Sequence, residues 1–471
     1  MSQSTDPRIL IVAEHASLKY GGEAALPLHY FRVLRRRGVD VRLIVHERTR
    51  NELQSIFVED FHRIHFVKSK AWKRFLCKLQ KRLPHRLACF SIGTILRLSN
   101  QIEQRRIIQE IMQQHQIDII HQPMPVSPKE PSLLFNMGVP VAIGPMNGGM
   151  DYPPAFRHRQ SPWVNLSLSI GRFFANFVNT LIPGKRQAKV LLVANQRTKE
   201  ALPKNICGKT IELVENGVDF STWQSTGDPE AVSLKETWEP KNSLHSKEDS
   251  LLPTRFVYVG RLVDWKAVDL LLPAFKQVAQ QLPVTLEIIG DGVQRSKLEA
   301  QAQELGLMES EHQSNTVGED RDIQGSVRFS GWCSPADCAQ KLRESDTLVL
   351  PSLLECGGAA VLEAMAIGLP VVATNWGGPA DYLDESCGIL VDPTSQEEFI
   401  GGFAAAMTKL ALSPDLRHSM GQAAQQRVRQ NFDWEVKADT ILNIYREAID
   451  DTPEHLVGRA VKLQQQPSFS S

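Results

Sequence analysis

The sequence predicts an α/β protein built from two doubly wound parallel sheets. Short apolar runs alternate with helical patterns along the chain, and several of these runs end in loops that contain glycine. With 471 residues the chain is too long for a single hydrophobic core and suits two domains. Hydrophobic residues make up 42% and charged residues 23% of the chain, which is typical of a globular protein.

The composition argues against several classes of function. The formal net charge is +0, so the chain as a whole has no attraction toward nucleic acid, and we expect no nucleic-acid partner. The seven cysteines show no C-x-x-C spacing that would indicate a zinc site. The N-terminus lacks the pattern of a signal peptide, and no apolar run has the length of a membrane span. These features predict a cytoplasmic protein with free thiols.

The first half opens with a strand, a glycine turn, a helix and a second strand. Residues 8–13 are predicted as a strand rich in β-branched side chains, and Gly21 and Gly22 precede a helical pattern that ends at Gly38. Residues 39–45 then form the next strand. This order predicts the start of a doubly wound sheet, in which the glycine turn presents N–H groups at a helix start. No G-x-G-x-x-G pattern is present, which argues against a nicotinamide cofactor.

His121 stands at the end of another predicted strand in this half. Open α/β sheets bind ligands at the carboxyl ends of their strands, so His121 is a candidate binding residue. The alternative is a histidine that is hydrogen-bonded within the fold. Residues 190–195 are predicted as the last strand of the first domain.

An amphipathic basic helix is predicted over residues 68–86. No acidic residue occurs from Phe61 to Ile102, and lysines and arginines alternate with apolar side chains within the predicted helix. Such a helix is typical of a surface that meets anionic lipid or an anionic acceptor. A solvated basic helix packed on the domain is the alternative.

Two carboxylates of the second half flank a predicted helix start. Residues 347–350 indicate a buried strand, Glu355 lies in the following loop, and Glu363 lies in a helix predicted over 359–367. Between the carboxylates, the small residues leave N–H groups free to face a phosphate, which the helix dipole favours. These small residues are Gly357, Gly358 and Ala359.

Carboxylates accept hydrogen bonds from hydroxyl groups, so a carboxylate on each side of a phosphate site suits a sugar and a ribose. Eight helical residues rise about 12 Å, which is too far for one acid/base couple that cleaves a bond. The alternative is a helix-capping loop with a solvated Glu363.

Two cations follow a strand predicted over residues 256–259. Arg261 offers a planar fork and Lys266 a compact charge, and both suit a diphosphate. A pair of surface cations is the alternative. Near the end of the chain, residues 420–449 are predicted as one helix with an apolar face, and residues 452–471 as a disordered tail.

In combination these motifs resemble the family 4 glycosyltransferases, the glycosyl transferases group 1, which are retaining enzymes of the GT-B fold. The resemblance runs over most of the chain and is strongest from about Phe256 to Pro393. The residue at 267 departs from the pattern, because the family commonly has glycine where Ala267 stands. The matching residues are Glu355 and Glu363 of an E-x7-E motif, the LEAMAIGLPVVAT segment, the turn Gly377-Gly378, and Gly260-Arg261-Leu262 with Lys266 of a GRL…K motif.

The resemblance implies two Rossmann-like domains that face each other across a cleft. The first would comprise residues 1–207 and be completed by a C-terminal helix, 434–451, and the second would comprise residues 208–433. The implied reaction moves a sugar from a UDP- or GDP-linked donor to a saccharide or lipid-linked acceptor, with retention of configuration. The family also suggests polysaccharide or cell-envelope glycan synthesis at the inner face of a membrane, which residues 68–86 would contact.

The resemblance also implies a role for each site residue. Arg261, Lys266 and the N–H groups around Gly357, Gly358 and Ala359 would stabilise the departing diphosphate. Because cations take this part, we expect no divalent metal, and no cofactor besides the nucleotide-diphosphate sugar as co-substrate. The other implied roles are Glu363 on the ribose hydroxyls, Glu355 on the sugar hydroxyls, His121 on the donor sugar, and Gly21 and Gly22 facing the donor diphosphate and the acceptor.

Two other functions fit the same architecture. A GT-B sugar-nucleotide epimerase would convert the sugar nucleotide without an acceptor, and a non-catalytic GT-B subunit would convert nothing. The complete set of motif residues argues against both.

Overall fold

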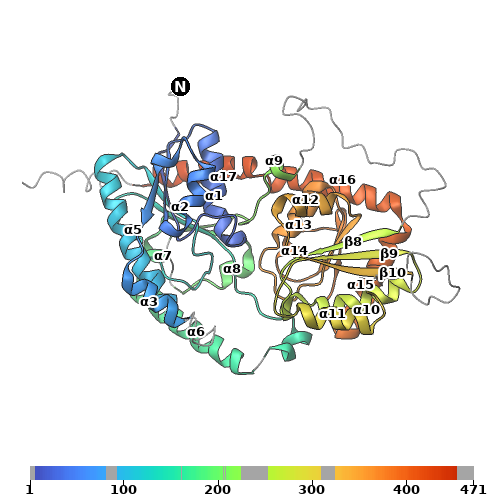
Figure 1. Cartoon of the computed structure of the whole chain (residues 1–471). Helices are drawn as coiled ribbons and strands as arrows, with labels where there is room; N and C mark the ends of the chain where they lie inside the picture. The colour runs from blue at the N-terminus through green and yellow to red at the C-terminus, as the bar shows by residue number, and fades with distance from the viewer. Residues whose placement is uncertain are drawn as a thin grey trace, which may run out of the picture. The chain divides into compact units, whose positions relative to one another are not determined.

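The chain divides into two compact units in a computed structural model that describes residues 6–80, 93–160, 162–204, 206, 208–223, 253–308 and 324–452. The first unit comprises residues 1–149, 162–216 and 434–471, and the second comprises residues 150–161 and 217–433. Each unit contains one parallel sheet with helices packed on it (Figure 1). The predicted α/β class, with two Rossmann-like domains, is confirmed.

The sheet of the first unit has seven strands among the described residues, in the order β3-β2-β1-β4-β5-β6-β7. The order reverses between β1 and β4, and such a topological switch point is where open α/β sheets bind ligands. The strands are β1 (Ile9–Val12), β2 (Val41–His46), β3 (Ile64–Val67), β4 (Ile119–Gln122), β5 (Val141–Met146), β6 (Val190–Val193) and β7 (Lys209–Glu212).

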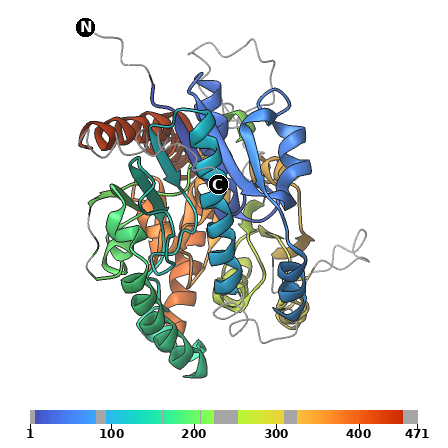
Figure 2. The same ribbon diagram turned by 90° about the vertical axis from the view of Figure 1, so that its left-hand side faces the viewer.

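The helices of the first unit cover both faces of this sheet. Strand β1 shows the reason, because Ile9 and Ile11 belong to one apolar cluster, whereas Leu10 and Val12 belong to the other. In Figure 2, α5 (cyan) lies in front of the strands, over the second of these clusters. The helices are α1 (Gly22–Arg36), α2 (Arg50–Ile56), α3 (Ala71–Gln80), α5 (Thr94–Gln114), α6 (Pro162–Leu181), α7 (Gly184–Gln187), α8 (Gln196–Glu200) and α17 (Trp434–Asp450), with 3-10 turns η1 (Glu47–Thr49) and η2 (Phe61–Arg63).

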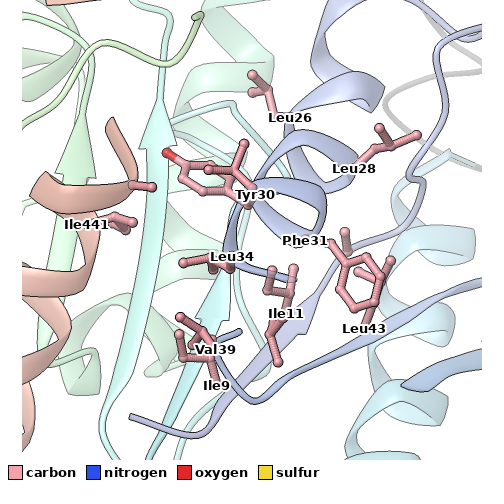
Figure 3. Packing of buried hydrophobic residues seen from close by; sticks show 14 of the residues in the cluster. Ile9, Ile11, Leu26, Leu28, Tyr30, Phe31, Leu34, Val39, Leu43 and Ile441 are labelled. Carbon is pink, nitrogen blue, oxygen red and sulfur yellow. The ribbon is translucent and has the colours of Figure 1, made fainter. Parts of the chain in front are cut away.

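The C-terminal helix α17 packs on α1, so the predicted return of this helix to the first domain is confirmed. Figure 3 shows Ile441 of α17 beside Tyr30 and Leu34 of α1. Lys437 on the same helix donates hydrogen bonds to the carbonyl oxygens of Val214 and Asn216. The predicted apolar face is wholly buried: Trp434, Ala438, Ile441, Leu442 and Tyr445.

Three predicted boundaries differ from the structure. Strand β6 is not the last strand of the first unit, because β7 pairs with it, and this unit continues to Asn216 instead of residue 207. The helix predicted over 420–449 consists of two helices, α16 (Pro414–Asn431) and α17, because the backbone leaves the helical conformation at Phe432.

The second unit has a parallel sheet with six strands among the described residues, in the order β10-β9-β8-β11-β12-β13. Figure 1 shows α10, α11 and α15 on one face and α12, α13 and α16 on the other. The strands are β8 (Thr254–Val259), β9 (Val284–Ile289), β10 (Gly325–Gly331), β11 (Thr347–Leu350), β12 (Val371–Thr374) and β13 (Gly388–Val391). The remaining elements are α9 (Phe220–Trp223), η4 (Pro154–Arg159), η6 (Asp264–Lys266), α10 (Val268–Ala279), α11 (Arg295–Glu304), α12 (Pro335–Arg343), α13 (Ala359–Ile367), α14 (Gly378–Tyr382) and α15 (Gln396–Leu412).

Residues 150–161 belong to the second unit although the chain on both sides of them belongs to the first. Phe156 packs edge-on against Phe399, with ring centres 5.4 Å apart. The indole Nε1 of Trp376 donates a hydrogen bond to the carbonyl oxygen of Asp151 at 2.9 Å. These contacts explain why this segment belongs to the second unit and not, as predicted, to the first domain.

Two predictions fall on residues that the structure does not describe: the tail beyond Thr452, and residues 81–86 of the basic helix. Within the described part of the chain, no helix combines the length and the apolarity that a membrane span needs.

Candidate functional site

The loops that follow β8 and β11 carry half of the predicted site residues, and α13, which follows the second loop, carries two more. These two strands are neighbours in the sheet, and the strand order of the second unit reverses between them. Their loops therefore lie at the topological switch point, where a ligand is expected. The backbone N–H of Leu353 donates to the carbonyl oxygen of Trp265 at 2.9 Å, which holds the two loops together.

Lys266 and Glu355 form an ion pair between these two loops. Their side chains are 13% and 16% exposed, so the pair is largely shielded but reachable. Burial, and secondarily the charge of Arg261, lower the pKa of Lys266 to about 8. The structure thus brings two of the predicted residues into direct contact, although 89 positions separate them in the chain.

Arg261 lies beside this pair and is exposed. Its guanidinium carbon is 5.7 Å from the centre of the Trp265 ring, within the range of a cation–π contact. Its own carbonyl oxygen accepts a hydrogen bond from the Tyr258 hydroxyl at 3.1 Å. The backbone of Arg261 is therefore anchored while its charge faces solvent.

The backbone conformation at Ala267 explains why the family commonly has glycine at this position. Its backbone has φ 53° and ψ 32°, the left-handed conformation that L side chains rarely adopt. The chain needs this conformation to turn from Lys266 into α10. Glycine would take it without steric cost, which is the physical reason to expect glycine at this position.

The loop before α13 is fixed by close approach of backbone to backbone. Gly358 caps α13 with φ 98°, and the N–H of Gly378 donates to the carbonyl oxygen of Glu355 at 2.8 Å. A β-carbon on Gly378 would overlap the carbonyl oxygen of Gly357 and lie 2.6 Å from that of Cys356. The first N–H groups of α13, which have no acceptor within the helix, are thereby held in place.

Glu363 lies half-buried on α13 among fully buried apolar neighbours such as Leu362 and Met365. Burial raises the pKa of its carboxyl to about 7. Its charge also helps to raise the pKa of the Cys338 thiol on α12, second to the burial of that thiol. An ionised carboxylate among apolar neighbours lowers the stability of the fold. Such a destabilising charged residue is typical of a ligand-binding site.

The glycine turn of the first unit is open. Gly21 caps α1 with φ 93°, and both Gly21 and Gly22 are exposed. A β-carbon added to either would have no atom within 4 Å. The backbone conformation of Gly21 already favours glycine. At Gly22 close packing of the chain does not require glycine, whereas a ligand that approaches the backbone would.

His121 lies in the core of the first unit with 0% exposure. Its Nε2 donates to the carbonyl oxygen of Gly144 at 2.6 Å, and its Nδ1 accepts from the Tyr445 hydroxyl at 2.7 Å. Burial lowers its pKa to about 4, so the ring is neutral at pH 7. The geometry does not support the predicted contact with a donor sugar: His121 ties β4 to β5 and α17.

A cavity of about 300 Å³ at the carboxyl edge of the first unit's sheet was not foreseen from the sequence. Its buried amide side chains include Gln104 of α5 and Gln122 of β4. Polar residues on α5 have the spacing of a solvated helix face, so no local pattern sets them apart. Only Gln122, adjacent to His121 at the end of a strand, carried a positional signal.

Solved structures with the same fold cover nearly the whole chain. A sucrose-phosphate synthase from Thermosynechococcus elongatus superposes with a TM-score of 0.61 at 18% identity, over 94% of this chain and 99% of that one. HepE from Anabaena in complex with UDP superposes with a TM-score of 0.57 at 16% identity, over 93% of this chain and 100% of that one. The fold is therefore that of the GT-B glycosyltransferases.

The sequence comparisons name particular enzymes, whereas the solved structures above show the fold alone. Residues 253–411 match the model of the family Glycosyl transferases group 1. A D-inositol 3-phosphate glycosyltransferase of Segniliparus rotundus is 28% identical over 245 residues, which cover 51% of this chain and 47% of that protein. A glycogen synthase of Mycobacterium tuberculosis is 27% identical over 240 residues, 50% of this chain and 49% of that protein. The chain spans about half the length of these curated relatives, and the resemblance to group 1 glycosyltransferases is confirmed over the matched segment.

Proposed function

We propose that the protein is a retaining glycosyltransferase that uses a nucleotide-diphosphate sugar, UDP- or GDP-linked, as its donor. The observation that carries this proposal is the pairing of Lys266 with Glu355 at the switch point of the second sheet, next to Arg261 and the start of α13. The match to group 1 glycosyltransferases supports it, as does the UDP in the complex of Anabaena HepE, a protein of the same fold.

In the proposed mechanism, Arg261 and Lys266 stabilise the charge that develops on the departing diphosphate. The N–H groups of Gly357, Gly358 and Ala359 add to this stabilisation, because the start of α13 favours an anion. Two cations and a helix start make a divalent metal unnecessary in this proposal. Glu363 accepts hydrogen bonds from the ribose hydroxyls and Glu355 from the hydroxyls of the transferred sugar.

A thermal-shift screen with UDP, GDP, ADP and their common sugars tests the donor site. A ligand at 100 times its dissociation constant adds about 2.7 kcal/mol of stability. We expect stabilisation by one base, lost in Lys266→Ala and Glu363→Ala but kept in Lys297→Ala, which removes an exposed lysine of α11 in the same unit. The donor-site assignment fails if no nucleotide stabilises the wild-type protein.

The stereochemistry and the reaction class need separate measurements. NMR of the anomeric proton in the first product distinguishes retention from inversion. Conversion of the sugar nucleotide without an acceptor would indicate an epimerase, and nucleotide binding without any turnover would indicate a binding subunit.

We further propose a role in polysaccharide or cell-envelope glycan synthesis by a cytoplasmic protein that contacts the inner face of a membrane and takes a saccharide or lipid-linked acceptor. Trp72 and Phe75 of α3 are 45% and 66% exposed, while Lys73 points inward and donates to Asn100. On α6, Phe174 and Phe177 are 56% and 54% exposed. In Figures 1 and 2 both helices lie beyond the same end of the first unit's sheet.

Exposed aromatic side chains favour the interface of a bilayer, and the exposed Lys68, which precedes α3, adds attraction to anionic lipid. Sedimentation with vesicles of phosphatidylglycerol and phosphatidylcholine tests this contact. Binding should depend on the anionic lipid and fall in Phe75→Ser, but not in Val58→Ser, an equally apolar exposed position outside both helices.

A further inference from the structure

The strap, which we define as residues 150–161, is anchored on two helices of the second unit. Phe156 has 0% exposure, and its ring packs edge-on against that of Phe399 in α15. Arg159 forms an ion pair with Asp269 of α10, and both side chains are largely shielded from solvent. These contacts give the strap a fixed position on the second unit.

Trp376 and Met150 join the beginning of the strap to the turn that follows β12. The indole Nε1 of Trp376 donates to the carbonyl oxygen of Asp151 at 2.9 Å. The Cε and Sδ atoms of Met150 lie 2.5 and 2.9 Å from the ideal position of a β-carbon on Gly377. The thioether of Met150 therefore fills the space that a larger residue at position 377 would need, and the strap holds the turn by one hydrogen bond and one close packing contact.

The same turn is in direct contact with the backbone of Glu355. A β-carbon on Gly377 would lie 2.3 Å from the carbonyl oxygen of Glu355, and that oxygen accepts the N–H of Gly378 at 2.8 Å. The carboxylate of Glu355 is paired with Lys266. A continuous series of contacts thus runs from the strap through the turn to the Glu355 carboxylate.

We propose that Trp376 is a positioning residue for Glu355 in the transfer reaction, an inference that rests on the proposed function. The strap supplies a fixed acceptor, the indole holds the turn against it, and the turn sets the place of the Glu355 backbone. Glu355 lies in a loop, and a loop residue keeps a productive geometry only when its neighbours hold it. A displacement of about 1 Å in a reacting group can lower a rate about 100-fold. The indole N–H therefore affects the reaction without touching the substrate.

A purely structural role of Trp376 predicts a different result. If the indole only stabilised the fold, its loss would lower the free energy of unfolding and leave the folded site unchanged. A positioning role predicts weaker binding of the sugar-bearing donor and little change for the free nucleotide, because Glu355 is proposed to contact the transferred sugar. Trp376→Phe separates the two roles, since phenylalanine keeps an aromatic ring and lacks the N–H.

Hydrogen exchange of the full chain, followed by mass spectrometry, tests the contacts without any ligand. In Trp376→Phe, amides in peptides that contain residues 355–359 and 377–378 should exchange about fivefold faster, as expected for the loss of one hydrogen bond. Met150→Ala should act in the same direction and replaces Trp376→Phe if that variant does not fold. Arg157→Ala, at an exposed position of the strap, should exchange like wild type. Unchanged exchange in the folded variants would overturn the proposal.

A cycle of single and double variants tests the link to the donor. Calorimetry measures the binding of UDP, GDP and their common hexose conjugates to the full chain. Trp376→Phe should weaken the nucleotide sugar that wild type binds by about fivefold and leave the corresponding nucleotide nearly unchanged. In a Glu355→Ala background, the same substitution should add no further loss.

Two results of this cycle would overturn the proposal while leaving the donor site intact. One is an equal loss with and without the Glu355 side chain, and the other is an equal loss for nucleotide and nucleotide sugar. Failure of wild type to bind any nucleotide sugar would instead contradict the proposed function, and the exchange measurement would still decide whether the strap holds the loop.

Discussion

The two units use a pair of consecutive glycines in opposite ways. In the second unit, Gly377 and Gly378 allow one loop to pack on the backbone of another, so that a β-carbon would overlap carbonyl oxygens. In the first unit, Gly21 and Gly22 have open space around them. The same dipeptide therefore holds the loop before α13 in place in the second unit, whereas in the first unit it leaves the turn before α1 accessible.

The largest expected effect comes from Gly378→Ala. Its β-carbon would meet the backbone of Gly357 and Cys356, which cannot move as a flexible side chain does. We expect a loss of about 3 kcal/mol or more in the free energy of unfolding, with loss of nucleotide binding. Denaturant unfolding and calorimetry measure the two effects.

Gly401→Ala is the matched control for this substitution, because a β-carbon at Gly401 in α15 meets no atom within 4 Å. Alanine there should stabilise the helix by about 0.5–1 kcal/mol. Equal stability of the two variants would refute the idea that the Gly377-Gly378 turn locks the site.

The next prediction concerns the ion pair of Lys266 with Glu355, which lies in the loop before α13. Lys266→Met leaves the Glu355 carboxylate shielded without its partner, so we expect a loss of about 2 kcal/mol, less than for a fully buried pair. The double variant Lys266→Met/Glu355→Gln should recover most of that stability while donor binding stays lost. Recovery of binding together with stability would show that the pair is only structural.

Glu363 allows a test by pH. Because burial raises its pKa to about 7, the folded protein holds a proton that the unfolded chain releases near its ordinary pKa of about 4.3. The stability from this proton is complete below that ordinary value and is lost as the pH rises through about 7. Glu363→Gln should therefore be more stable than wild type at pH 8, by up to about 3 kcal/mol, and nearly equal at pH 4.

Nucleotide binding should change in the opposite direction at the same residue. Wild-type affinity should rise about fivefold from pH 6 to pH 7.5, as the carboxylate forms and while Lys266, with its pKa of about 8, is still mostly charged. Glu363→Gln should bind weakly at both values. Glu304→Gln, at an exposed position of α11, should follow the wild-type profile. A wild-type affinity that is flat with pH would remove Glu363 from the binding site.

The smallest effect on stability is expected for Gly22→Ala. The added methyl group meets nothing within 4 Å, so the free energy of unfolding should change by no more than about 0.5 kcal/mol. Turnover should nevertheless fall if a ligand approaches this backbone. Full turnover by Gly22→Ala would mean that the turn only begins α1 and that no ligand approaches it. The contrast drawn between the two glycine pairs would then be wrong.

The sequence predicted those parts of the molecule that depend on neighbouring residues. Strand β11 and helix α13 have the predicted bounds, because a short apolar run and a glycine-bounded helical pattern define them locally. The pairing of Lys266 with Glu355 depends on the order of strands in a sheet, and only their membership of one site was foreseen.

Three features had no local signal. Residues 150–161 have no period that reveals which unit they join. Gln104 has the spacing of a solvated position, and only the fold shows that it faces a cavity. His121 occupies a strand end that usually faces a ligand, but here Tyr445, which lies 324 positions further along the chain, covers it.

The return of α17 to the first unit also sets an order of events during synthesis. The ribosome releases α1 and β4 early, but the helix that covers Tyr30 and supplies Tyr445 to His121 is among the last described segments to emerge. Until then, the apolar strip of α1 remains open to solvent, and the nascent chain carries an exposed patch while the whole second unit is translated. Completion of the first unit therefore follows synthesis of the second.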